Sequence, residues 1–459
     1  MMPARVRPRR SVMLVGALTV LIATANPGAT APGDLDRTFD GDGKVTTNFL
    51  PVDEARGVAI QADGKIVAAG VAICPPCATP FTPHLFAVAR YNRDGSLDPT
   101  FDGDGKVTTD FDAREDEAFA VAIQGDGKII AAGSAFGPEA QDFALARYNP
   151  DGSLDVTFGG DGMVTSDFAG GNDRARAVII QPDGKIVAAG VAFSAACLPC
   201  DGPATDNFGL ARYNPDGSLD LTFGFVGRQV TDFEFGGPDE ARGVALQVDG
   251  KIVAAGVAIC DPCVTPVVLH DFALARYNPD GSLDATFGGD GTVTTNFEVQ
   301  DEAQGVALQP DGRIVAAGSA AQSSGARLFA LARYATNGSL DTAFDGDGKV
   351  TTQIAEDDGA RAVTIQSDGK IVAAGFAFLF SDQNDFALTR YNANGSLDTI
   401  FGGGDGIVTT DFGSFDQANA IALQADRKIV AAGFTDGDFA LARYKVCRVS
   451  SRRSSIPCR

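Results

Sequence analysis

Apolar and polar residues alternate along many short segments of the chain. In Lys106–Phe111, the side chains of Val107, Thr109 and Phe111 fall on one face by the two-residue period of a β-strand. Such segments are rich in β-branched residues and bounded by Gly, Asp or Asn, which favours strands over helices. The first complete unit therefore predicts four strands, over Arg56–Gln61, Lys65–Gly70, Phe86–Tyr91 and Lys106–Phe111.

Three strings of residues recur seven times in a fixed order. Gly-Ser-Leu-Asp-x-x-Phe, or a close variant, begins at Gly33, Gly95, Gly152, Gly217, Gly281, Gly338 and Gly395. Asp-Gly-Lys-Ile-Val-Ala-Ala-Gly, with small changes, begins at Asp63, Asp126, Asp183, Asp249, Asp311, Asp368 and Asp426. Phe-Ala-Leu-Ala-Arg-Tyr, with small changes, begins at Phe86, Phe143, Phe208, Phe272, Phe329, Phe386 and Phe439. Their spacing of roughly 55 to 65 residues is typical of propeller blades.

Four-stranded sheets repeated around a channel form a β-propeller, which leaves only short, protected sheet edges. Ala68, Ala69 and Gly70 predict a thin strand that lets neighbouring sheets pack closely. The last unit stops after its third strand, at Tyr444, whereas a spare fourth strand, Lys44–Phe49, precedes the first unit. We therefore predict an all-β, seven-bladed propeller of four-stranded antiparallel blades, closed by this N-terminal strand.

These repeats resemble the delta-60 repeat family, a bacterial β-propeller domain whose function is largely unassigned. The resemblance rests on the three repeated strings and covers about Gly33 to Tyr444. It implies a propeller with secretion or surface display, and it brings no catalytic residues with it. The third unit departs from the pattern at Gly224-Phe225-Val226-Gly227, where its neighbours have Gly-Asp-Gly, which argues against a ligand role for that loop.

The N-terminal region has the features of a signal peptide. Arg5–Arg10 is basic, Val12–Ala23 is apolar but too short to span a bilayer comfortably, and Ala23-Thr24-Ala25 supplies a cleavage pattern. The predicted organisation is a signal peptide over 1–25, a short linker over 26–32, the propeller over 33–446 and a Ser/Arg-rich disordered tail over 447–459. We expect an exported protein in the extracellular space, at the cell surface or in the periplasm.

The net charge of the chain limits the classes of partner that we expect it to bind. Its formal net charge is −22, and such an acidic surface repels phosphate backbones, which excludes nucleic acid as the expected partner. Cations and basic protein surfaces fit better. No later segment is apolar enough to span a membrane, and we expect a monomer.

The chain offers little for catalysis. All seven tyrosines occupy one repeat position, there is no Trp, and only two His are present. The tyrosine nucleophile of sialidase-type propellers is therefore missing, and no Ser/His/Asp or nucleophile-elbow arrangement stands out. We assign no catalytic residue and expect no enzyme; a propeller hydrolase or lyase is the least favoured alternative.

Cysteine pairs mark the segments between second and third strands. Three Cys-x-x-Cys pairs occur there, namely Cys74 and Cys77, Cys197 and Cys200, and Cys260 and Cys263. An exported protein favours a small disulfide in each pair. Because His84 and His270 each follow a pair by seven residues, zinc or copper sites from Cys74, Cys77 and His84, and from Cys260, Cys263 and His270, are the alternative.

Repeated aspartates provide a second candidate site. An Asp precedes each first strand, at Asp53, Asp116, Asp173, Asp239, Asp301, Asp358 and Asp416. If that strand lines the channel, these carboxylates ring one mouth and bind a cation or a basic peptide. The alternative is that each Asp caps its turn by accepting backbone N–H bonds. The Asp-Gly-Asp-Gly segments at Asp40–Gly43, Asp102–Gly105 and Asp345–Gly348 likewise predict turns, with calcium as the alternative.

Propeller topology places the loops between second and third strands on the same face as the loops between units. Their lengths differ widely, from Val71–Leu85 through Ser134–Asp142 to the minimal Phe434–Asp438. Specificity is usually carried by such variation on a regular scaffold. We therefore predict a secreted or surface-displayed, non-enzymatic scaffold that binds a protein or glycan partner at this face. The alternative is a calcium- or other metal-binding structural component of the cell envelope.

Overall fold

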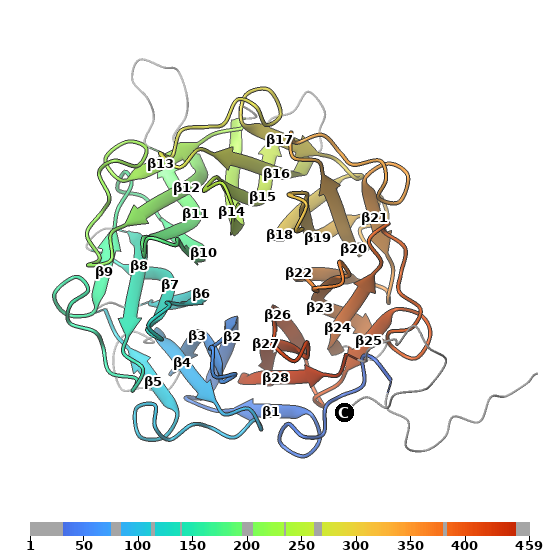
Figure 1. The fold of residues 1–459 in the computed structure, drawn as a ribbon, viewed down its shortest axis with the longest axis horizontal. Coiled ribbons are helices and arrows are strands. Elements are labelled where there is room, and N and C mark those ends of the chain that lie inside the picture. Colours follow the sequence, from blue (N-terminus) through green and yellow to red (C-terminus); the bar gives the residue numbers. More distant parts are fainter. Residues whose placement is uncertain are drawn as a thin grey trace, which may run out of the picture.

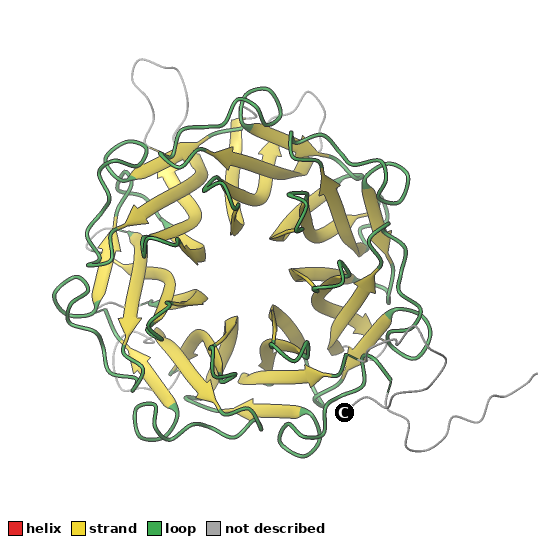
Figure 2. Ribbon diagram, viewed as in Figure 1, coloured by secondary structure: helices red, strands yellow, loops and turns green. Residues whose placement is uncertain are grey.

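The computed structural model describes residues 31–74, 84–111, 115–137, 140–194, 205–233, 236–260, 269–379 and 383–446. The predicted signal peptide, nearly all of the linker and the C-terminal tail lie outside these residues. Within the described residues the chain consists of strands and loops without a helix (Figure 2), which confirms the predicted all-β class. The same residues accordingly contain no helix of the length and apolarity needed to cross a membrane.

The innermost strand of each unit lies beside a central space, and the second strand packs outside it (Figure 1). The innermost strands are β2 (Val52–Ile60), β6 (Glu117–Ile123), β10 (Arg174–Ile180), β14 (Gly236–Leu246), β18 (Gln300–Leu308), β22 (Asp358–Ile365) and β26 (Asp416–Leu423). The second strands are β3 (Ile66–Ile73), β7 (Ile129–Phe136), β11 (Ile186–Ser194), β15 (Ile252–Cys260), β19 (Ile314–Ala321), β23 (Ile371–Leu379) and β27 (Ile429–Thr435).

Two further strands complete each unit toward the outside. The third strands are β4 (His84–Tyr91), β8 (Gln141–Tyr148), β12 (Thr205–Tyr213), β16 (Leu269–Tyr277), β20 (Arg327–Tyr334), β24 (Gln383–Tyr391) and β28 (Asp438–Tyr444). The outermost strands are β5 (Lys106–Thr109), β9 (Met163–Ser166), β13 (Arg228–Thr231), β17 (Thr292–Thr295), β21 (Lys349–Thr352), β25 (Ile407–Thr410) and β1 (Lys44–Thr47). The four strands predicted for the first complete unit are confirmed, but β2 begins four residues earlier than predicted, so Asp53 lies inside the first strand rather than before it.

The strands pair antiparallel in sequence order within each unit. Five sheets have four strands each, and one has eight because a single parallel bridge between His270 and Gln300 joins two neighbouring units. The N-terminal strand β1 pairs antiparallel with β28, with Lys44 opposite Ala442 and Thr47 opposite Phe439. The predicted outer-edge position of the Lys44–Phe49 segment is thus observed for β1.

The core lies between neighbouring sheets. Second strands such as β3, with the sequence IVAAGVAI, are buried on both faces along almost their whole length. Tyr91 is fully buried, and its hydroxyl donates to Thr47 Oγ1 of the preceding unit at 2.9 Å. Tyr148 and Thr109 repeat this contact at 2.7 Å. The repeated tyrosines therefore join neighbouring sheets.

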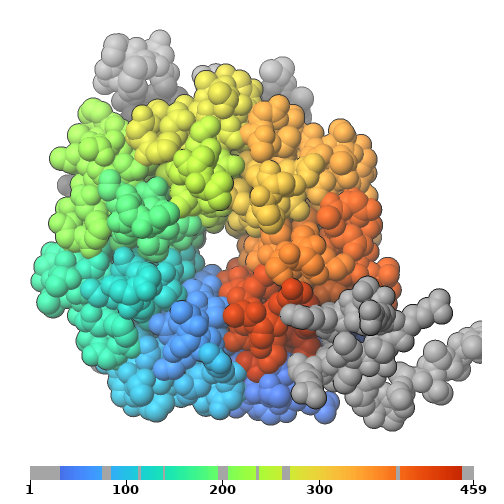
Figure 3. Space-filling model, viewed as in Figure 1, coloured from blue at the N-terminus to red at the C-terminus, as the bar shows by residue number. Residues whose placement is uncertain are grey.

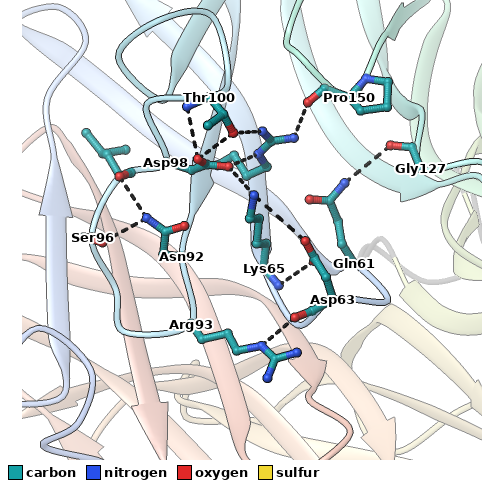
Figure 4. Close-up of polar contacts among 12 residues, drawn as sticks. Gln61, Asp63, Lys65, Asn92, Arg93, Ser96, Asp98, Thr100, Gly127 and Pro150 are labelled. Atoms are coloured by element: carbon teal, nitrogen blue, oxygen red, sulfur yellow. Dashed lines mark hydrogen bonds and ion pairs between the residues drawn. The ribbon is translucent and has the colours of Figure 1, made fainter.

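The repeated arginine also has a structural role. Arg90 Nε donates to Asp98 Oδ2 at 2.7 Å, and a second arginine nitrogen donates to the carbonyl of Pro150 in the next unit (Figure 4). Lys65 approaches the same carboxylate at 2.8 Å. An Arg–Asp pair of this kind occurs in every unit, and in the last unit it joins Arg443 to Asp36 near the start of the described chain. The arginine of the pair also reaches the next unit, as Arg90 does through the carbonyl of Pro150.

Candidate functional site

The innermost strands surround a central cavity of about 570 Å³. The space-filling view shows the molecule hollowed at this position (Figure 3). Five glutamates, five arginines and several amide side chains line the cavity, and Phe119 is its single aromatic residue. Glu115 and Gln141, which also line it, lie in a loop between units and at the start of a third strand. The cavity therefore extends toward the face that carries the variable loops.

Each innermost strand contains a β-bulge, at the same place in every unit. In β2, Ala55 is opposite Gly70 and Gly57 is opposite Ala69. Arg56 between them therefore has no residue opposite it in β3. A bulge of this kind re-aims a side chain and often lies beside a functional site. The seven residues left unpaired, here called the bulge residues, all line the cavity: Arg56, Phe119, Arg176, Arg242, Gln304, Arg361 and Asn419.

The glycine of the second strand is required by this bulge. A Cβ atom built on Gly70 would lie 1.8 Å from the carbonyl oxygen of Glu54, a distance that no side chain can occupy. The same conflict of 1.8 to 1.9 Å exists at every equivalent glycine, from Gly133 to Gly433. The repeated Ala-Ala-Gly thus permits the bulge as well as close packing of neighbouring sheets.

Ion pairs connect three of the bulge residues, all of them arginines, to a second ring of residues. This ring, here called the rim residues, lies two positions earlier in each innermost strand: Glu54, Glu117, Arg174, Glu240, Glu302, Gly359 and Gln417. Arg56 bridges Glu54 at 2.9 Å and Glu117 at 2.7 Å. Arg242 bridges Glu240 at 2.9 Å and Glu302 at 2.5 Å in the same manner. Most of the cavity charge is therefore neutralised within the wall.

Both histidines also contact the rim residues. His84 Nδ1 lies 3.0 Å from Glu117 Oε1, and His270 Nδ1 lies 3.2 Å from Glu302 Oε1. The hydrogen bond with His270 and the charge of Arg242 hold the pKa of Glu302 well below its usual range, so this carboxylate is ionised. These histidines are therefore bound to carboxylates at the edge of the cavity.

The predicted aspartate ring has a different environment from the one expected. All seven carboxylates are buried, none lines the central cavity, and each accepts one or more backbone N–H groups. Asp53, for example, accepts from Leu50 N at 3.0 Å. These side chains point into the turns between units, and the expected cation binding stays a prediction. The turn-capping alternative describes their contacts.

Burial also changes the ionisation of these groups. Burial removes these carboxylates from water and raises the pKa of Asp173 and of Asp239 to about 7, although the two N–H bonds that each accepts act to lower it. Burial likewise raises the pKa of Asp53, Asp116 and Asp301 to about 6. The folded protein therefore retains protons on these carboxylates at pH values above the ordinary range of an aspartate.

Two groups of three aspartates bring carboxylate oxygens within 4.8 Å of one another. They are Asp142, Asp167 and Asp173, and Asp385, Asp411 and Asp416. In two equivalent places an asparagine replaces the middle residue and donates to the neighbouring aspartate at 2.8 Å, as Asn48 does to Asp438 and Asn296 does to Asp271. The carboxylates could hold a cation, although exposed acidic groups are common without one.

The Asp-Gly-Asp-Gly segments form turns. Asp40, Asp102 and Asp345 have positive φ angles of 49°, 50° and 51°. The second aspartate of each segment accepts the backbone N–H two residues later, as Asp42 does from Lys44 N at 2.8 Å. The φ angles and these bonds agree with the predicted turns.

The described cysteines are Cys74, which directly follows β3, and Cys260, which ends β15. Both are disulfide-bonded. The expected partners Cys77 and Cys263, and the pair Cys197 and Cys200, lie outside the described residues, so the three pairings stay predictions. A disulfide sulfur is not a thiolate, the form in which cysteine binds zinc, and His84 and His270 contact glutamates. These contacts do not favour the Cys/His metal sites.

The bulge residues were not among the residues predicted from sequence. The signal that marks them is a single variable position between small residues: Ala or Gly flanks each one, yet the position itself carries Arg, Phe, Gln or Asn. Variation at one position of a regular repeat distinguishes the units. Sequence alone does not place this residue in the cavity, because the bulge that directs it depends on the register between two strands.

Comparisons with known proteins agree with the fold. Segments of the chain match the model of a β-propeller domain of unknown function (DUF5122), over residues 85–101, 124–158, 181–223, 270–287, 309–344 and 366–401. A search of curated proteins found no match. The match supports a β-propeller of unknown function, while the delta-60 repeat resemblance stays a prediction.

Solved structures with a similar chain path have very different sequences. Drosophila Semaphorin 2a is 9% identical with a TM-score of 0.49, over 91% of this chain and 76% of that chain. The WD40 β-propeller domain of Doa1 is 10% identical with a TM-score of 0.47, over 90% and 98%. YCF48 bound to a D1 peptide is 13% identical with a TM-score of 0.43, over 90% and 97%. These likenesses carry no functional argument.

Proposed function

We propose that the chain is an exported binding scaffold that captures a ligand at its central cavity without converting it. In this proposal the sheets are the seven blades of one ring, and β1 on β28 closes that ring. The observation that carries the proposal is the cavity itself. Its wall is formed by bulge residues that differ from unit to unit on an otherwise regular scaffold.

The chemistry of the wall supports binding over catalysis. The tyrosines are buried between sheets, and the two histidines are engaged by glutamates. Arg56 and Arg242 are each held between two carboxylates. Such a wall is suited to hydrogen bonding a polar ligand. A protein or glycan partner would enter from the variable-loop face.

The experiment is saturation-transfer NMR on the full chain with a panel of chemically defined neutral sugars, sugar acids and short peptides. We expect magnetisation transfer to at least one ligand, with no new product signals after prolonged incubation. Gln304→Trp, which fills the cavity, should abolish the transfer. Val248→Trp adds the same bulk at a fully exposed position and should leave it unchanged. Product formation, or transfer that survives Gln304→Trp, would contradict the proposal.

A second candidate function, a metal-stabilised component of the cell envelope, is favoured by the two groups of three aspartates. Cation binding there would relieve the repulsion between neighbouring carboxylates. Thermal unfolding in EDTA, followed by addition of calcium or zinc, tests it. A rise in the unfolding temperature that Asp142→Asn abolishes would support this candidate, and an unchanged temperature would remove it.

A further inference from the structure

The arginines among the bulge residues follow one pairing rule. Three of the four donate to the rim glutamate of the next unit, Arg56 to Glu117 at 2.7 Å, Arg176 to Glu240 at 2.7 Å and Arg242 to Glu302 at 2.5 Å. Each pair places a guanidinium beside a carboxylate across the boundary between two units. The rule therefore predicts a glutamate after Arg361 as well.

Arg361 is the exception to this rule. The rim residue of the next unit is Gln417, which has the shape of glutamate but no charge, and the rim residue of its own unit is Gly359. Within the described part of the chain Arg361 has no ion pair, and its Nε atom is buried without a hydrogen-bond partner. The guanidinium carbon of Arg361 lies 5.4 Å from the centre of the Phe376 ring.

Arg361 is influenced by charges of both signs, from Arg242 and Arg327 and from Glu302 and Glu54. Burial, together with the charges of Arg242 and Arg327, lowers the pKa of Arg361. A poorly solvated charge without a partner destabilises the folded state unless a ligand compensates it. Amide side chains of Gln304, Gln417 and Asn419 line the same cavity and offer donors and acceptors to a ligand beside the guanidinium.

We propose that Arg361 binds the carboxylate of a singly charged sugar acid in the central cavity. The planar guanidinium matches a carboxylate with two parallel hydrogen bonds. A single charge fits because, within the described residues, Arg361 is the one bulge arginine that is not paired with a glutamate. Hydroxyl groups fit because the other wall residues are amides and carboxylates, whereas Phe119 is the single aromatic residue. This inference rests on the proposed binding function and names its ligand class.

The test is isothermal titration of the full chain at neutral pH with D-glucuronate as the probe. D-glucose has the same ring without the carboxylate, and inorganic phosphate is an anion without the ring. We expect heat of binding with glucuronate and affinity lower by about 10- to 100-fold for the other two, the range that a charged hydrogen-bonded pair supplies.

Two variants test the residue itself. Arg361→Gln should lower glucuronate affinity by about 10-fold or more. Gln417→Glu supplies the missing partner with the geometry of the Arg56–Glu117 pair, so it should raise the unfolding temperature and abolish glucuronate binding. Arg37→Gln removes one positive charge from an exposed loop and should change neither property. If Arg361→Gln fails to fold, Gln417→Glu still provides the test.

Several results would overturn the inference. Equal glucuronate affinity in the wild type and Arg361→Gln would show that the arginine does not bind it, as would unchanged binding in a stabilised Gln417→Glu. Equal binding of phosphate, lost in the same variant, would replace the sugar acid with a general anion. Binding of a neutral ligand in the cavity without any response to glucuronate would reject this inference while the proposed function stands.

Discussion

At the scale of single residues, the same side-chain type carries out opposite roles according to its surroundings. Asp220 is buried beside Lys185 and Arg212, at 2.8 and 2.7 Å. Although burial acts to raise its pKa, the bond from Lys185 and the neighbouring charge hold the pKa below its usual range. Burial, together with the charges of Asp167 and Asp142, raises the pKa of Asp173 although two backbone N–H bonds act in the opposite direction. Partners, rather than burial alone, decide whether such a carboxylate is ionised.

Loss of the Asp220 carboxylate should strongly destabilise the fold. Asp220→Ala leaves Arg212 buried without its partner, and removal of one member of a buried ion pair typically costs about 3–5 kcal/mol. Chemical denaturation followed by intrinsic fluorescence measures the change in free energy of unfolding. Asp216→Ala, on an exposed turn of the same unit, is the control and should cost less than about 1 kcal/mol. Similar losses for both variants would contradict the structural role of the Arg212–Asp220 pair.

Stability should fall as the pH rises toward neutral. The pKa of Asp173 is about 7 in the folded protein, against an ordinary value of 3.8. The folded state therefore holds this proton more tightly than the unfolded state, and that contribution is lost as pH increases from about 4 to 7. We expect a lower unfolding temperature at pH 7.5 than at pH 5.

The matched variant isolates this group. Asp173→Asn keeps an oxygen acceptor for the backbone N–H of Phe168 but cannot ionise. Its unfolding temperature should decline less between pH 5 and pH 7.5 than that of the wild type. Asp183→Asn, at an exposed turn, should retain the wild-type decline. Parallel pH profiles for Asp173→Asn and the wild type would contradict the assignment.

At the scale of elements, the bulge in the innermost strand depends on the glycine opposite it in the second strand. Gly190→Ala would place a Cβ atom 1.8 Å from the carbonyl oxygen of Arg174. Relief of this overlap requires a shift of the innermost strand, with an expected loss of about 1–3 kcal/mol or more. Thermal unfolding measures the loss, with Gly125→Ala as control because its Cβ would meet nothing within 4 Å. Equal stability of both variants would show that the bulge is not maintained by the glycine.

At the scale of the whole molecule, the first strand connects the two ends of the chain. Phe39 and Val45 pack in one cluster with Phe439 and Leu441. Asp36 is paired with Arg443 at 2.8 Å. The N-terminal segment therefore covers the edge of β28 and supplies the partner of a buried arginine.

Removal of that segment should lower the stability of the whole fold. A chain that begins at Val52 lacks β1 and leaves the edge of β28 open, a position at which strands tend to associate. We expect a lower midpoint of denaturation and self-association in size-exclusion chromatography. A chain that begins at Ala31 retains β1 and is the control. Unchanged behaviour of the shorter chain would contradict a closing role for this strand.

The repeated strings determined much of the fold, because local patterns of apolar residues, glycine and turn residues specify strands and hairpins. The four strands of the first complete unit and the position of β1 on β28 could be predicted in this way. The tyrosines and the Arg–Asp pairs repeat in every unit. Such repetition indicates a structural role, because a residue that makes the same contact in every unit supports the fold.

Only the tertiary structure showed which side chains meet at the centre. The direction of Arg56 or Arg361 depends on a bulge, and a bulge is a property of the register between two strands rather than of one strand's sequence. The burial of Asp53 beside Phe49 and Leu50 depends likewise on how one unit meets the next. Sequence therefore determined the repeated frame, whereas strand register and the packing of units decided the cavity and the unpaired charge of Arg361.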